Sequence, residues 1–152
     1  MIEIMRKEDL AQIVDLEKKC FNDAWNLEQI ENELEVNPFS NGYMLKENDK
    51  VVAYAFMWET FEMAQIARIG VDPDQRKKHY GQKMMEELFE KARSGGCEYM
   101  SLEVRESNTA AIKLYEKIGF VTVNVSKGYY SDNENAIVIY YRNKVLVRDL
   151  LK

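Results

Sequence analysis

Residues 64–120 read AQIARIGVDPDQRKKHYGQKMMEELFEKARSGGCEYMSLEVRESNTAAIKLYEKIGF, and their pattern decides the fold. An apolar run leads into a basic turn, Arg76 to Gly81, and two segments with helical periodicity follow. A short alternating segment separates these two helices. The order predicts a strand, a turn able to cradle phosphate, a helix, a second strand and a second helix.

The two helical segments have one apolar face each. Apolar residues recur at positions 84, 85, 88, 89 and 92, and again at 110, 111, 114, 115 and 118. Gly95-Gly96 and Gly119 stand where a helix ends, because glycine accepts left-handed backbone. Ser107 or Asn108 can cap the start of the second helix.

The segment between the helices alternates with the period of a strand. Met100, Leu102 and Val104 fall on one face, and Glu103 falls on the other. We therefore expect Glu103 to project from the polar side of a strand.

The rest of the chain predicts shorter elements around this central block. Asn37-Pro38 should end a helix, and the polar residues 47–50 should form a hairpin turn. The expected strands cover residues 2–5, 43–45, 51–58, 121–125 and 137–141, and the expected helices cover residues 10–17 and 27–34.

Composition restricts the class of protein. The chain has 152 residues, of which 46% are hydrophobic, which suits one domain with a core at residues 1–142 and an extension at 143–152. We expect the extension to pack on its own domain rather than on a second subunit, and the oligomeric state stays open. A net charge of −5 argues against a nucleic-acid partner.

No sequence signal indicates a membrane or a metal. No apolar stretch approaches the roughly 20 residues that span a bilayer, and residues 1–10 lack a signal-peptide core, so the cytoplasm is the expected location. Cys20 and Cys97 are far apart without metal-ligand spacing, so we expect both to be reduced.

In its central block, residues 64–120, the chain resembles the GNAT N-acetyltransferases, and among them the ribosomal-protein-alanine (RimI-like) enzymes. The matching motifs are Val71-Asp72-Pro73, the turn 76–81, Leu102-Glu103-Val104-Arg105, Ser107-Asn108, Ala110-Ala111 and residues 114–120. Cys20-Phe21 with Trp25, and Gly128-Tyr129-Tyr130, match more weakly. Three positions depart from the family: His79 replaces a glycine, Asn135 an aspartate and Ala24 a proline.

The resemblance implies a fold and an activity. It implies a single α/β (α+β) domain with a mixed, mostly antiparallel sheet flanked by helices. It also implies transfer of an acetyl group from acetyl-coenzyme A, a cosubstrate, to a primary amine, above all the N-terminal α-amine of a protein such as a ribosomal protein, without a metal. A small-molecule or polyamine acetyltransferase is the alternative, and a non-catalytic binding module is a third.

The resemblance also implies roles for individual residues. Glu103 would be the general base and Tyr115 the general acid, and a peptide groove would be lined by Trp25, Tyr129 and Tyr130. The cofactor-binding residues would be Ile69, Gly70, Val71, Arg76, Lys77, Lys78, His79, Tyr80, Gly81, Gln82 and Asn108. The turn 76–81 meets a helix start, whose free N–H groups bind anions without a particular side chain.

Structural readings compete with these roles. Glu103 can be a surface carboxylate paired with Arg105 or Lys113, and Tyr115 can be a core aromatic of its helix. For His79 we expect a negative φ, so that the histidine costs little where the family has glycine.

Overall fold

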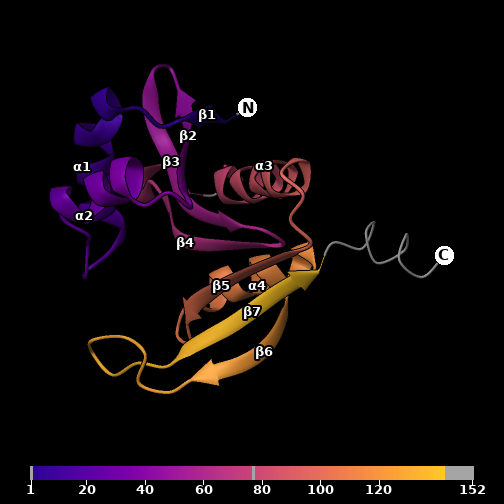
Figure 1. The fold of residues 1–152 in the computed structure, drawn as a ribbon. Helices are drawn as coiled ribbons and strands as arrows, with labels where there is room; N and C mark the ends of the chain where they lie inside the picture. The colour runs from indigo at the N-terminus through magenta and orange to yellow at the C-terminus, as the bar shows by residue number, and fades with distance from the viewer. Residues whose placement is uncertain (1, 77, 143–152) are drawn as a thin grey trace.

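The computed structural model describes residues 2–76 and 78–142. Their strands form one seven-stranded sheet in the order β1-β2-β3-β4-β5-β7-β6 (Figure 1). The strands are β1 (Glu3–Ile4), β2 (Ser40–Glu47), β3 (Lys50–Thr60), β4 (Met63–Val71), β5 (Tyr99–Arg105), β6 (Val121–Ser126) and β7 (Ala136–Arg142). The expectation of a mixed, mostly antiparallel sheet is confirmed, because β4 and β5 form its one parallel pair within the described residues.

Helices flank this sheet. They are α1 (Leu10–Cys20), α2 (Leu27–Glu31), α3 (Tyr80–Ser94) and α4 (Thr109–Ile118), with short turns η1 (Lys7–Asp9), η2 (Asn32–Val36) and η3 (Pro73–Gln75). The expected helix at 27–34 is divided, since α2 passes into the π-helical turn η2 before Pro38. Residues 143–152, the expected extension, lie outside the described residues, as does Lys77.

The helix ends follow the local sequence. Asn108 caps α4 by accepting the N–H of Ala111 at 3.2 Å, so of the two candidate caps this one is used. Gly119 ends α4 with φ +124°, a conformation that favours glycine.

Two apolar clusters cover the two faces of the sheet. Tyr54 and Phe56 of β3 pack with α1 and α2, whereas Ala55 and Met57 pack in the cluster that holds α3. All four side chains are fully buried. β3 is therefore covered on both faces of the sheet, which is why residues 51–57 are all apolar.

The parallel pairing of β4 and β5 stops halfway along both strands. It runs from Met63 opposite Tyr99 to Ile66 opposite Leu102. On the other side of β4, Met57 opposes Ile66 and Phe56 opposes Arg68, so Ala67 is an extra, bulged residue. A bulge bends its strand, and from this point β4 runs on to Val71 without pairing with β5. A gap between the two strands results.

Gly70 lies in the unpaired part of β4, directly against Tyr54. A Cβ at Gly70 would lie 2.7–2.8 Å from the Cε1, Cζ and hydroxyl atoms of the tyrosine. Tyr54 is fully buried and its hydroxyl donates to Glu17, so the ring has no room to move. Packing therefore demands glycine at position 70.

Gly70→Ala should destabilise the protein by about 1–3 kcal/mol, the usual cost of overpacking a close contact. Urea unfolding measures the change. Gly81→Ala is the matched control, because its Cβ would lie no closer than 3.6 Å to Leu114 or Val71. Equal stability of the two variants would contradict the close approach of Tyr54 to β4.

Candidate active site

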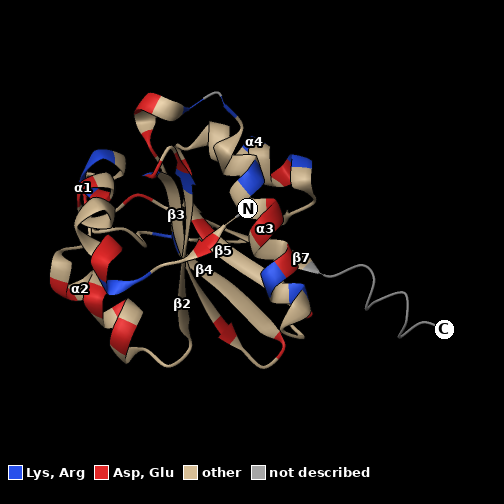
Figure 2. Cartoon of the chain, turned by 90° about the horizontal axis from the view of Figure 1, so that it is seen from above, with Lys and Arg blue, Asp and Glu red and all other residues tan. Residues whose placement is uncertain are grey.

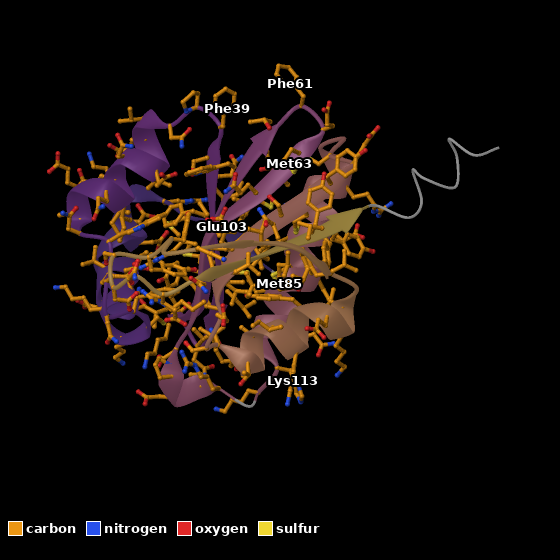
Figure 3. The ribbon with its side chains drawn as sticks, turned by 90° about the horizontal axis from the view of Figure 1, so that it is seen from below. Phe39, Phe61, Met63, Met85, Glu103 and Lys113 are labelled. Carbon is orange, nitrogen blue, oxygen red and sulfur yellow. The ribbon has the colours of Figure 1, made fainter. Side chains whose placement is uncertain are left out.

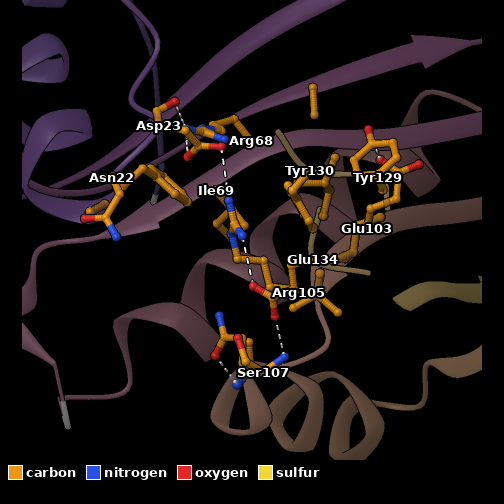
Figure 4. A pocket seen from close by; sticks show the side chains of 18 of the residues that line it. Asn22, Asp23, Arg68, Ile69, Glu103, Arg105, Ser107, Tyr129, Tyr130 and Glu134 are labelled. Atoms are coloured by element: carbon orange, nitrogen blue, oxygen red, sulfur yellow. Dashed lines mark hydrogen bonds and ion pairs between the residues drawn. The ribbon is translucent and has the colours of Figure 1, made fainter. Parts of the chain in front are cut away.

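A pocket of about 840 Å³ opens at the gap between β4 and β5 (Figure 4). The loop between α1 and α2 forms one wall, and the loop between β6 and β7 forms another. Of the site residues expected from sequence, this Glu103 pocket brings together Trp25, Ile69, Glu103, Asn108, Tyr115, Tyr129 and Tyr130. The residues expected to hold phosphate lie outside it, at the end of β4 and the start of α3.

Glu103 projects into the pocket from β5. Its strand neighbours Leu102 and Val104 are buried on the other face, as the alternation predicted. The hydroxyl of Tyr129 donates a hydrogen bond to Oε2 of Glu103 at 2.8 Å. The competing reading, an ion pair with Arg105 or Lys113, finds no support: no such pair forms among the described residues, and Figure 3 shows Lys113 far from Glu103.

Tyr115 is both a core residue and a pocket residue. Its side chain is buried, and its ring meets that of Phe120 edge-on at 5.7 Å. Burial raises the pKa of Tyr115 to about 12. The hydroxyl therefore stays protonated at any physiological pH.

Arg105 ties three segments together around the pocket. Its guanidinium donates to Asp132 at 2.8 Å and to Glu134 at 2.9 Å, both in the β6–β7 loop. It also bonds Asp23 of the α1–α2 loop at 3.3 Å and lies 4.0 Å from the ring centre of Tyr130. Arg105 thereby fixes the two loops that wall the pocket.

Glu134 joins the same loop to the start of α4. It accepts the N–H of Ser107 at 2.9 Å and a guanidinium N–H of Arg105. Hydrogen bonds from Ser107, and after them from Arg105, lower the pKa of Glu134 to about 2. The carboxylate therefore stays charged well into the acid range.

Glu17 organises the other wall from a fully buried position on α1. It accepts from Nε and Nη2 of Arg68 at 2.9 and 2.6 Å, from the backbone N–H of Trp25 at 2.8 Å, and from the hydroxyl of Tyr54. Arg68 in turn lies 3.7 Å from the ring centre of Phe21. This buried charge pair holds the loop that carries Trp25.

Sequence reasoning missed these charged residues as parts of the site. Asp23 accepts from Arg105 and lies 3.5 Å from Arg68, so it bridges β5 and β4 across the gap. The partners are separated by 45 and 82 residues. In the sequence these residues are visible only as single charged positions. No helical or strand periodicity links them, so their pairing could not be predicted.

Cys20 contacts the open end of β4. Its thiol donates to the carbonyl of Val71 at 3.2 Å, and burial raises the pKa of the thiol to about 11. Cys20 and Cys97 are both free, as expected. A protonated thiol is a poor nucleophile, so Cys20 has a packing role here.

The turn that is expected to bind phosphate, residues 76–81, follows a bend capped by Asp72. Asp72 accepts the N–H of Asp74 at 2.9 Å, and α3 begins at Tyr80, so the N–H groups of Tyr80, Gly81 and Gln82 lie in its first turn. Arg76 is exposed, and Lys78 donates to Gln75 at 2.8 Å.

The expectation for His79 is wrong. His79 immediately precedes α3 and has φ +62° and ψ +22°, which is left-handed backbone. The chain needs this conformation to enter the helix from the turn, and glycine adopts it without strain. The histidine therefore stands at a position that favours the glycine usual in the family.

The comparisons with known proteins agree with this geometry. The chain belongs to the acetyltransferase (GNAT) family, whose model matches residues 10–120. The fold, the site and the relatives together define an N-acetyltransferase.

The relatives point to one kind of N-acetyltransferase. A [ribosomal protein bS18]-alanine N-acetyltransferase from Escherichia coli K12 is 34% identical over 100 residues, covering 64% of this chain and 68% of the relative. The Haemophilus ducreyi enzyme of that name is 27% identical over 143 residues, covering 91% and 97%. The crystal structure of the ribosomal-protein-S18-alanine N-acetyltransferase from E. coli superposes with a TM-score of 0.87 at 28% identity, covering 93% of this chain and 92% of that one.

The described residues contain neither a membrane-spanning helix nor a cluster of metal ligands. No helix there is long and apolar enough to cross a membrane. No group of three or more histidine, cysteine or acidic residues there could hold a metal ion.

The left-handed backbone at position 79 predicts the ranking of two variants. His79→Gly should be more stable than His79→Ala by about 1 kcal/mol, because a Cβ is strained at positive φ. Both variants lose the imidazole, so the comparison isolates the backbone. Urea unfolding measures it, and a more stable alanine variant would show that φ is negative.

The lowered pKa of Glu134 predicts a pH dependence. A carboxyl group whose pKa is lower in the folded state stabilises the fold above its unfolded pKa, near 4.5, and this contribution is lost as the pH falls towards 2. Glu134→Gln should therefore be less stable than the parent at pH 6, and the difference should shrink between pH 4.5 and pH 2. Urea unfolding along a pH series gives the curve, and a constant difference would refute the lowered pKa.

Proposed function

We propose that this N-acetyltransferase transfers the acetyl group of acetyl-coenzyme A to the N-terminal α-amine of a protein in the cytoplasm, with a ribosomal protein as the acceptor. The observation that carries the proposal is Glu103, a carboxylate that projects into a large open pocket that Tyr115 also lines. The names of the relatives support the acceptor.

The open edge of β4 fits the amide-bearing arm of coenzyme A. Alternate residues of a strand direct their N–H groups to opposite edges, and the N–H of Asp72 donates to Val52 on β3. The N–H groups of Ile69 and Val71 therefore face the gap. An extended ligand with amides can pair with them as an added strand would.

The turn and the first turn of α3 suit the pyrophosphate. Free N–H groups and the helix dipole favour an anion there, and Arg76 and Lys78 add positive charge. Asn108 already caps α4, and it also lines the Glu103 pocket. Lys77, assigned to the same turn, stays a prediction.

Glu103 accepts the proton that the acceptor amine must lose. An α-amine has a pKa of about 8, so most of it is protonated and unreactive at neutral pH. Glu103 lies beside the gap and takes this proton directly or through one water. The neutral amine then attacks the thioester carbonyl, where the N–H of Val71 stabilises the developing oxyanion.

Tyr115 serves the departing sulfur. With a pKa of about 12, its hydroxyl is always a hydrogen-bond donor. Burial raises the pKa of Tyr115 above that of a thiol, so full transfer of its proton to the thiolate is uphill. Its main contribution is therefore a hydrogen bond to the thiolate, and the proton released by the amine completes the exchange.

Tyr129 controls access to Glu103. Its hydroxyl occupies one carboxylate oxygen and its ring meets that of Tyr130 edge-on at 5.0 Å. Together with Trp25, these rings offer apolar walls to the pocket, while Glu103 supplies negative charge for an ammonium group. A peptide N-terminus combines these two properties.

The test uses acetyl-coenzyme A and a short peptide with N-terminal alanine, with release of free thiol as the readout. The peptide should exceed spermidine and free lysine in kcat/KM, since a peptide groove reads residues beside the amine. Glu103→Gln and Tyr115→Phe should each lower kcat about 10²-fold with the fold intact. Preference for spermidine, or wild-type rates in both variants, would contradict the proposal.

A further inference from the structure

A second cavity, of about 610 Å³, lies beside the Glu103 pocket, between α2, η2 and β3. We call it the α2 cavity. Its walls carry two indole rings, Trp25 and Trp58, and two carboxylates, Glu28 and Glu33, with amide side chains between them. Trp25 lines both cavities, so they adjoin at this residue.

The surface around the α2 cavity is acidic. Residues 21–45 include five acidic residues and no lysine, arginine or histidine. The charge of this segment, −5, is as large as the net charge of the whole chain. Figure 2 shows acidic residues along α2. Asp23 is paired with arginines and Glu35 lies 3.7 Å from Lys7, but Glu28 and Glu33 have no cationic partner in the described part of the chain.

Glu33 is held in one orientation. Nε1 of Trp58 donates to its Oε2 at 2.7 Å, and Nδ2 of Asn37 donates to the same oxygen at 3.3 Å. Within residues 2–76 and 78–142, Oε1 accepts no hydrogen bond. The cavity thus presents a fixed carboxylate oxygen beside an indole ring.

This chemistry selects a cation with apolar flanks. Indole faces attract guanidinium and ammonium groups, and a carboxylate forms charge-assisted hydrogen bonds with them. The methylene stem of arginine or lysine packs on aromatic rings while its charged end reaches the carboxylate. A neutral or acidic side chain would leave both carboxylates unpaired.

We infer that the α2 cavity binds an arginine or lysine side chain of the acceptor polypeptide, a few residues beyond the amine that is acetylated. The inference rests on the proposed function, because a peptide whose N-terminus lies at Glu103 must pass Trp25 to reach the cavity. An extended chain advances about 3.3 Å per residue, so one or two sequence positions should fit.

Tryptophan fluorescence reads this binding without catalysis. The chain has two tryptophans, and both line the α2 cavity. The probes are peptides with N-terminal alanine and one arginine at positions two to seven, each matched to a peptide with citrulline, the neutral isostere. A saturable change in fluorescence should occur with arginine at one or two adjacent positions and at least tenfold more weakly with citrulline.

The same peptides give the kinetic test. Arginine at the favoured position should raise kcat/KM about tenfold over citrulline. The gain should appear in KM and not in kcat, because the bound side chain takes no part in the reaction. Glu33→Gln, which keeps an acceptor oxygen for Trp58, should abolish this advantage. Glu90→Gln, which changes the charge equally at an exposed position of α3, should leave the advantage of arginine intact.

The outcomes separate this inference from the proposed function. Acetylation of all peptides with no difference between arginine and citrulline would overturn the inference alone. Equal effects of Glu33→Gln and Glu90→Gln would also overturn it, since only general charge would then matter. Failure of every peptide to be acetylated would overturn the proposed function and the inference with it.

Discussion

The early end of the β4–β5 pairing is the constraint on which the site depends. The ladder stops after Ile66 and Leu102, where Ala67 bulges out of β4. Beyond that point the N–H groups of Ile69 and Val71 face a gap instead of a strand. The same gap lets Glu103 on β5 reach an open pocket although both of its strand neighbours are buried.

A gap in a sheet needs support from elsewhere, and charged side chains supply it. Arg68, the first residue after the bulge, is bound by the buried Glu17, and Arg105 on β5 is bound by Asp132 and Glu134. Asp23 reaches both arginines across the gap. A buried charge left alone is costly, so Arg68 holds the fully buried Glu17 firmly, and with it the loop that carries Trp25. Arg105 is partly exposed and holds the loop that carries Tyr130 through several contacts at once.

The acidic residues have two different uses in this molecule. Asp23, Asp132 and Glu134 are neutralised by arginine and define the walls of the Glu103 pocket. Glu28 and Glu33 stay without a cation among the described residues and face the adjoining cavity. Part of the uncompensated negative charge of the chain thus lies beside the Glu103 pocket.

The sequence by itself determined the features that depend only on residues close together along the chain. Apolar periodicity located α3 and α4, glycines marked their ends, and alternation put Glu103 on the open face of β5, because each rests on the geometry of one helix or strand. Tertiary structure alone decided the bulge at Ala67, the partners of Glu17 and Arg105, and the hydrogen bond from Trp58 to Glu33. These features depend on which distant segments pack together, and neither a local period nor a short motif encodes that contact.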